Sequence, residues 1–137
     1  MCQWKSISVK LGRGTIQISA QTIKDACDII LQAAKKGQVI HYSDLWNMLK
    51  QLGHRGINRG TIGSIVGEVS IQISQVTNPS IYPSAIVVRK DTGKPGEGFW
   101  GLDSGTNPPS RVPKNMRAKA LQQYQHDVFH RTWNCHC

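Results

Sequence analysis

The sequence predicts an α+β fold, a winged helix-turn-helix core with a β-hairpin before it and a helix after it. Two segments with the apolar spacing of α-helices flank a glycine-containing turn at residues 52–57. A β-rich stretch that carries cations follows at residues 84–102. The chain is also strongly basic, with 17 Lys and Arg against 8 Asp and Glu and a net charge of +9. Helix, turn, helix and basic hairpin is the element order that this fold requires.

The length of the chain predicts one domain, residues 1–137, because 137 residues suffice for a single modest core. We divide it into a β-hairpin (4–19), a winged-helix core (21–102), and a linker with a C-terminal helix (103–137). No apolar run approaches the roughly 20 residues of a membrane span, so we expect no membrane partner. The first residues lack the apolar segment of a signal peptide, which predicts a cytoplasmic protein.

The N-terminal third predicts a hairpin and a helix. Residues 4–9 and 15–19 alternate apolar and polar side chains around a Gly-Arg-Gly turn, which predicts two paired strands. Thr22 followed by Asp25 resembles a capping box and predicts the start of a helix there. The expected buried face of this helix is apolar at three- and four-residue spacings: Ile23, Ala26, Cys27, Ile30, Leu31 and Ala34.

Residues 39–73 predict the helix-turn-helix. Ser43 is a favourable N-cap for a helix over residues 44–51, and Gly53 ends it. Asn58 is a strong N-cap for the next helix, which we expect to end near Ile73. Its buried stripe is Ile62, Ile65, Val66, Val69 and Ile73. Its other face carries several glycines, which weaken a helix by about 1 kcal/mol each relative to alanine and suit a close approach by another backbone.

The remainder of the chain predicts a wing and a last helix. Residues 84–90 and 98–102 are expected to be the two strands of a β-hairpin, joined by the loop at 91–96. After a proline-rich linker, residues 114–133 predict a helix. Its buried side chains are expected to be Leu121, Tyr124, Val128 and Trp133.

The expected nucleic-acid interface lies at the N-terminal end of the helix that begins near Asn58. There the positive end of the helix dipole and polar side chains meet phosphates and base edges. The candidates are Arg55, Asn58, Arg59, Thr61 and Ser64. The wing adds Arg89, Lys90 and Lys94, and the C-terminal helix adds Lys114 and Arg117. We expect DNA rather than RNA; an acidic protein is the alternative partner for the positive charge.

Residues 84–99 read Ser-Ala-Ile-Val-Val-Arg-Lys-Asp-Thr-Gly-Lys-Pro-Gly-Glu-Gly-Phe and follow the Tyr-x-x-Leu segment at 42–45. In these two segments the chain resembles small, mostly uncharacterised winged-helix-like proteins of bacteria and phages. The resemblance covers about half of the chain and implies the fold more than the function.

A second, weaker pattern consists of Gly37, Val39, Tyr42, Leu45, Asn58, Arg59 and Gly63. In these residues the chain is similar to the DNA-binding domain of alkylguanine alkyltransferases and alkyltransferase-like proteins. In that family a helix reads the minor groove and an arginine takes the place of a flipped base, which implies this role for Arg59. The family's Pro-Cys-His-Arg motif has no counterpart; the nearest stretch, residues 83–86, reads Pro-Ser-Ala-Ile. The resemblance therefore implies minor-groove binding without alkyl transfer.

An enzyme is the class that the residues favour less. A metal-dependent nuclease needs clustered carboxylates, and the candidates Glu68, Asp91 and Glu97 lack the spacing of the common nuclease core. His126 and His130 are four residues apart, without the Glu that a helical zinc motif places beside the first His. We expect no catalytic residues and no cofactor.

The four cysteines, Cys2, Cys27, Cys135 and Cys137, contain no CxxC pair. For a cytoplasmic chain we expect no disulfide framework, and Cys27 to be a core residue. The ending Cys135-His136-Cys137 has metal-binding side chains, which Cys2 or His130 would complete as a zinc site. We expect no metal there, because this spacing is tighter than usual and chain ends fray.

These observations lead to one main prediction: a non-catalytic protein that binds nucleic acid, most simply double-stranded DNA. The alternative is a small interaction or inhibitor protein, such as a regulatory or anti-defence factor of a phage or mobile element, that acts on a nucleic-acid enzyme. The oligomeric state is left open by the sequence.

Overall fold

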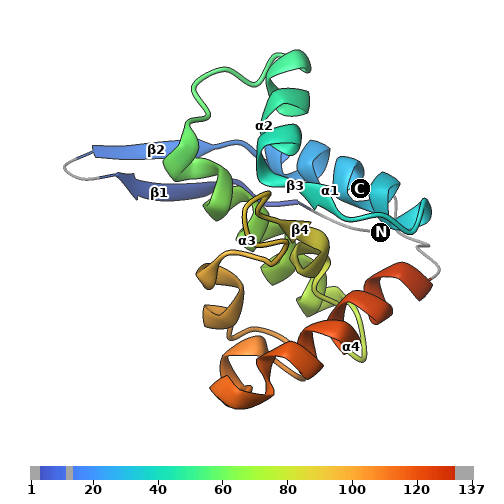
Figure 1. Cartoon of the computed structure of the whole chain (residues 1–137). Coiled ribbons are helices and arrows are strands. Elements are labelled where there is room, and N and C mark those ends of the chain that lie inside the picture. Colours follow the sequence, from blue (N-terminus) through green and yellow to red (C-terminus); the bar gives the residue numbers. More distant parts are fainter. Residues whose placement is uncertain (1–3, 12–13, 132–137) are drawn as a thin grey trace.

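The computed structural model describes residues 4–11 and 14–131, in which four α-helices pack with two small sheets (Figure 1). The helices are α1 (Ala20–Lys35), α2 (Tyr42–Gln51), α3 (Arg59–Val76) and α4 (Arg117–His130). The α+β class is therefore confirmed. No helix in this part of the chain has both the length and the apolar character that crossing a membrane requires.

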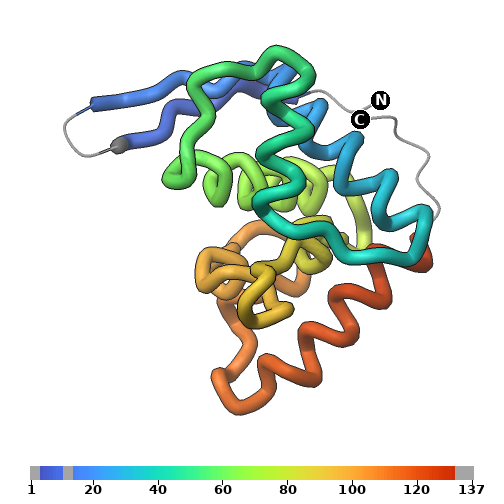
Figure 2. The backbone as a smooth tube through the Cα atoms, turned by 45° about the horizontal axis from the view of Figure 1, so that its top comes forward, coloured from blue at the N-terminus to red at the C-terminus, as the bar shows by residue number. Residues whose placement is uncertain are grey.

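The N-terminal hairpin is confirmed and projects from the body of the molecule (Figures 1 and 2). β1 (Ile7–Leu11) pairs antiparallel with β2 (Gly14–Ile18). The side chain of Gln72 on α3 holds the residue that leads into this hairpin: it accepts from the backbone N of Lys5 and donates to its O, both at 3.0 Å. The amide of Gln72 thus binds Lys5 as a neighbouring strand would.

Helix α1 begins three residues earlier than predicted. Ser19 is the N-cap, with an extended backbone, and its hydroxyl accepts from the backbone N of Thr22 at 3.2 Å. The predicted start at Thr22 was wrong because Ser19 is already placed to cap the third helical residue. The predicted buried face is confirmed, since all six of its side chains are buried.

Cys27 lies in the core, as predicted, and is 0% exposed. It is also disulfide-bonded, so the expectation of no disulfide framework was wrong at this position. That expectation came from the cellular compartment, which says nothing about the geometry that brings two thiols together.

A second sheet joins a segment before α2 to a segment after α3. β3 (Ile40–His41) pairs parallel with β4 (Val87–Val88). This pairing keeps β3 extended up to His41, which is therefore the N-cap of α2. Ser43 lies inside the helix, and its predicted capping role was wrong.

The predicted wing is not a β-hairpin in this structure. Residues 98–101 belong to a 3-10 helix, η2 (Glu97–Gly101), instead of a strand. A second 3-10 helix, η1 (Pro83–Ile86), precedes β4, whose partner is β3. The backbone of β4 is thus already paired, and the buried Phe99 packs in the 3-10 helix edge-to-face on Tyr124, with ring centroids 5.5 Å apart.

A tight turn occupies the place of the predicted wing loop. The backbone N of Arg89 donates to the O of Lys94 at 2.9 Å, and the N of Gly93 donates to the O of Arg89 at 2.8 Å. Gly93 has φ +68°, a conformation that glycine adopts without strain. The turn is exposed and carries cations, as the sequence predicts for the wing tip.

Helix α3 crosses the middle of the molecule and supplies its central packing surface (Figure 2). Asn58 caps it as predicted, and its five-residue apolar stripe is buried. The helix runs to Val76, three residues beyond its predicted end.

Helix α4 runs along the opposite side of the molecule from α2 (Figure 1). Two further 3-10 helices, η3 (Pro109–Arg111) and η4 (Lys114–Met116), lead into it. Tyr124 and Val128 are buried as predicted, and Leu121 is partly buried. Trp133, the fourth predicted core residue, lies outside the described residues.

Candidate nucleic-acid interface

A reciprocal capping box fixes the start of α3. The side-chain oxygen of Asn58 accepts from the backbone N of Gly60 at 2.8 Å and of Thr61 at 3.0 Å. The hydroxyl of Thr61 in return accepts from the N of Asn58 at 2.9 Å. Thr61 is only 1% exposed, so we assign it to the cap and remove it from the predicted interface. Asn58 stays exposed, with its amide nitrogen free of the cap.

Beside this helix end lies a groove of about 1090 Å³. One wall is the exposed face of α3, from Arg59 to Ile71, and the opposite wall is β1 of the hairpin. Tyr42 and Trp46 of α2 and the stretch from Arg89 to Phe99 complete the lining. The groove therefore follows the helix that the sequence predicts to read nucleic acid.

Glycines leave the groove-facing side of α3 without bulky side chains. A Cβ added at Gly63 would have no atom within 4 Å, and one at Gly67 would meet only Leu102 Cδ2 at 3.9 Å. The groove therefore reaches down to the helix backbone. This agrees with the expectation that the glycine-rich face permits close approach.

The groove carries more cations than anions. Lys10, Arg59, Arg89 and Lys90 line it, together with the carboxylates Glu68 and Asp91. Two of these cations are partly neutralised. Arg89 binds Asp91 through two hydrogen bonds of 3.0 and 2.8 Å, which lower the pKa of that carboxyl, and Lys90 lies 3.9 Å from Asp44.

Arg59 is, with Lys10, one of two cations of the groove that no carboxylate engages among the described residues. It is exposed, and no ion pair engages it among the described residues. It is the first residue of α3, where the backbone N–H groups give the helix its positive end. A phosphate or another anion is the natural ligand for such a position.

Two aromatic side chains make the groove rigid. The hydroxyl of Tyr42 accepts from the backbone N of Gly96 at 3.1 Å, and burial raises the pKa of Tyr42, so the phenol stays neutral. The indole N–H of Trp46 donates to the O of Ile57 at 2.9 Å. α2 is thus fastened to the loop before η2 and to the turn before α3.

Ser84 lies at the floor of the groove, where the alkyltransferase resemblance places a reactive cysteine. Its side chain is 2% exposed, and its hydroxyl is 2.6 Å from that of Ser70. The described residues that line the groove include no histidine and no cysteine. Ser84 is thus a buried polar residue in the floor of the groove, with Ser70 as its partner.

The structure brings together only part of the predicted set. Arg59, Ser64, Arg89 and Lys90 line the groove, and Lys94 lies in the exposed turn beside it. Arg55 lines a separate cleft of about 270 Å³ between β2, the start of α1 and the turn before α3.

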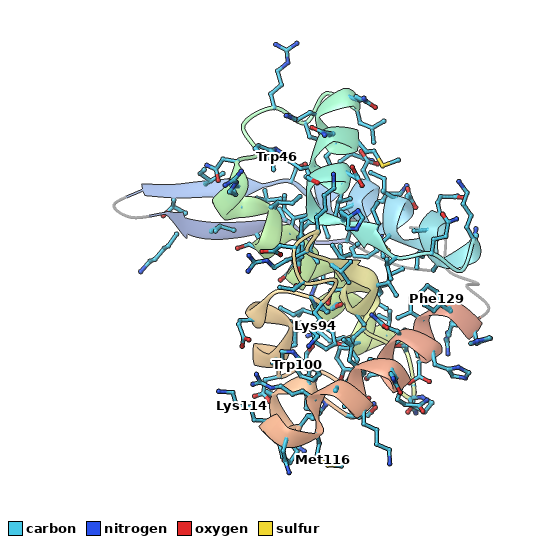
Figure 3. All side chains as sticks on the ribbon, viewed as in Figure 1. Trp46, Lys94, Trp100, Lys114, Met116 and Phe129 are labelled. Atoms are coloured by element: carbon cyan, nitrogen blue, oxygen red, sulfur yellow. The ribbon has the colours of Figure 1, made fainter. Side chains whose placement is uncertain are left out.

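Two predicted cations lie elsewhere. Lys114 is near the far end of the molecule from Trp46 (Figure 3). Arg117 is 3.4 Å from Glu97, and its guanidinium stacks 5.2 Å from the ring centre of Trp100. Its side chain is only 28% exposed, so it serves mainly to hold α4 on η2.

Sequence reasoning missed the contribution of β1 and α2 to the site. Lys10 was not singled out because it alternates with apolar residues as any strand residue does. Tyr42 was noted only as part of a resemblance. Nothing local in the sequence indicates that these side chains converge on α3.

No group of three or more His, Cys, Asp or Glu suited to a metal ion occurs within residues 4–11 and 14–131. The carboxylates considered for a nuclease are separately engaged, Glu68 with Gln72, Asp91 with Arg89 and Glu97 with Arg117. The rings of His126 and His130 lie 4.2 Å apart on α4. The Cys135-His136-Cys137 ending lies outside the described residues.

Comparisons with protein-family models, curated proteins and solved structures found no match to this chain.

Proposed function

We propose that this protein binds double-stranded DNA without catalysis, with the N-terminal end of α3 against the duplex. The observation that carries the proposal is the groove along α3, which opens beside the unpaired Arg59 and is bordered by cations. In this arrangement α2, the turn at 52–58 and α3 form the helix-turn-helix, and the turn at 89–94 takes the place of the wing.

The chemistry of the groove suits one unpaired nucleotide. Its lining offers the partly exposed apolar side chains of Trp46, Val9 and Ile71, and cations stand at its border. A base has apolar faces to stack, and its phosphates would meet Arg59 and Lys90. A volume of about 1090 Å³ is ample for such a guest. The alkyltransferase resemblance implies the same placement, with Arg59 filling the gap that an extruded base leaves.

DNA is the nucleic acid that this geometry favours. A helix end fits the grooves of B-form DNA, whereas the major groove of A-form RNA is deep and narrow and does not admit side chains easily. We place this binding in the cytoplasm, in line with the sequence.

Binding to a random duplex, measured by fluorescence anisotropy over a salt series, tests the proposal. The affinity is expected to fall steeply with salt. In a plot of the logarithm of the binding constant against the logarithm of the salt concentration, each phosphate contact contributes about −0.9 to the slope. Arg59→Ala and Lys94→Ala should each weaken binding and reduce that slope by about one contact. Lys36→Ala, at the exposed C-terminal end of α1, is the matched control and should change neither. Negligible affinity of the wild type at low salt would overturn DNA binding.

One observation favours a protein partner as the second candidate. A cleft of about 870 Å³ between α4 and residues 106–113 has an apolar floor that includes Val112 and Met116. Arg111, Lys119 and His126 line it, and none of its described lining residues is acidic. An acidic, amphipathic segment of another protein matches this lining. A regulatory or inhibitory role would use this cleft, and Met116→Asp should then abolish partner binding while leaving DNA binding unchanged.

A further inference from the structure

The turn that connects α2 to α3 is fastened to α1 by a chain of four polar side chains. His54 Nε2 lies 2.6 Å from Asp25 Oδ2, and His54 Nδ1 lies 3.0 Å from the hydroxyl of Thr22. That hydroxyl is 2.9 Å from the hydroxyl of Ser19, the N-cap of α1. We call these four residues the polar clasp.

Every member of the polar clasp can be satisfied at once. The carboxylate of Asp25 only accepts, so Nε2 of His54 carries the proton. With a neutral imidazole, the Thr22 hydroxyl donates to Nδ1 and the Ser19 hydroxyl donates to Thr22. Ser19 Oγ in turn accepts from the backbone N of Thr22. The side chains of His54 and Asp25 are only 15% and 19% exposed, so water competes little for these bonds.

Little else holds this turn. Leu52 is 58% exposed, and Gly53 and Gly56 both have positive φ. Within the described part of the chain, and beyond local backbone bonds, the turn is also held by the indole N–H of Trp46, which donates to the O of Ile57. Arg55 therefore lies between two fixed points, the clasp on one side and the indole bond on the other.

Arg55 depends on the clasp for its placement. It follows His54 directly, is exposed, and borders the same small cleft as Ser19, Thr22 and His54. A long side chain on a mobile turn would lose conformational entropy on binding, whereas a turn that is already fixed avoids part of that cost.

We infer that His54 is a positioning residue for nucleic-acid binding, which acts by fixing the turn that presents Arg55 and the start of α3. This inference rests on the proposed function. His54 itself makes no phosphate contact, because both of its ring nitrogens are used within the clasp. Its contribution is therefore preorganisation of the interface.

The experiment compares His54→Ala, Arg55→Ala and the double variant in the salt-dependent duplex assay. His54→Ala is expected to weaken binding roughly tenfold, within the range shown by coupled neighbours, and to leave the salt slope unchanged. Arg55→Ala should lower the slope by about one contact. When Arg55 is already alanine, His54→Ala should cause little further loss of duplex affinity, because the side chain that His54 positions is absent.

A second set of variants keeps the inference falsifiable if His54→Ala is poorly folded. His54→Gln retains a donor toward Asp25 and should keep most of the affinity. Asp25→Asn should weaken binding modestly, and Asp28→Asn, which affects an exposed pair on the same helix, should not. Amide exchange of residues 53–58 should quicken in His54→Ala while that of α4 stays unchanged.

The outcomes separate the two proposals. If the wild type binds and Arg59→Ala weakens it while His54→Ala does not, the positioning role is overturned and DNA binding stands. A drop of about one contact in the salt slope of His54→Ala would make His54 a phosphate ligand, which also overturns positioning. If the wild type does not bind the duplex, both fail.

Discussion

The hydroxyl of Ser70, on α3, lies 2.6 Å from the hydroxyl of Ser84, at the start of the chain segment that leads into β4. The same Ser70 oxygen accepts from the backbone N of Ser84 at 2.9 Å. Both residues are buried, at 0% and 2% exposure. One side chain on α3 thus satisfies two polar groups of η1 and fixes the floor of the groove.

Ser70→Ala is expected to destabilise the fold by about 1–3 kcal/mol, because it leaves the buried N–H of Ser84 without a partner. Urea unfolding followed by circular dichroism measures this. Ser43→Ala, at an exposed position of α2, is the control and should stay within about 0.5 kcal/mol of the wild type. An equally small effect of Ser70→Ala would show that water replaces the lost bond.

Gly63→Leu is expected to block the groove without harming the fold. The new side chain starts in open space, and removing a helical glycine should raise stability by up to about 1 kcal/mol. Duplex affinity should nevertheless fall at least tenfold. We take a tenfold loss as the smallest effect that indicates a nucleotide entering the groove. Gln75→Leu, at an exposed position near the other end of α3, is the control. Unchanged affinity in Gly63→Leu would show that nothing enters the groove on binding.

Lys10→Ala is expected to weaken duplex binding and to reduce the salt slope by about one phosphate contact, because Lys10 borders the groove from the hairpin side. Lys5→Ala removes an equal charge from an exposed residue that precedes β1 and does not line the groove. Anisotropy titrations of both variants make the comparison. Equal effects would mean that only the total charge matters.

Tyr124 is expected to make stability depend on alkaline pH. Burial, with the negative charges of Tyr82 and Asp127 acting in the same direction, raises the pKa of Tyr124 from 10.0 to about 12. The folded state therefore holds the proton more tightly than the unfolded state. This contribution to stability is complete below about pH 10 and is lost as the pH rises through 12.

Ultraviolet titration of tyrosinate measures this pKa, and unfolding at successive pH values measures the loss of stability. Tyr124→Phe should be less stable at neutral pH, since its hydroxyl no longer donates to the O of Asn107. It should also lose less stability between pH 10 and 12. A residual slope will remain, because burial raises the pKa of Tyr82 as well. Titration of Tyr124 near 10 would contradict this prediction.

The helices were predictable because each buries one face against the core. The stripe of α3 and the Asn58 cap follow from local spacing and hydrogen-bonding chemistry, and both are confirmed. The caps of α1 and α2 were misassigned among neighbouring candidates. Ser19 and His41 are the N-caps because the strands before them are held extended by pairing with other strands.

The wing was mispredicted because strand pairing is decided by tertiary contacts. A run of β-branched residues at 86–88 fits either an antiparallel hairpin or a parallel pair, and only the distant β3 distinguishes them. The glycines around Phe99 also permit the 3-10 turn that brings its ring to the core. The candidate site shows the same limit: its cations were visible in the sequence, whereas the groove between β1 and α3 was not.

The bond between Lys5 and Gln72 has a consequence for synthesis on the ribosome. The two residues are 67 positions apart, so at roughly 5–20 residues per second the anchor is made about 3–13 s after the hairpin strand that it holds. A two-stranded hairpin alone is marginal in water. The hairpin thus lacks this anchor until Gln72 has been synthesised, and its apolar strand face needs shielding during that interval.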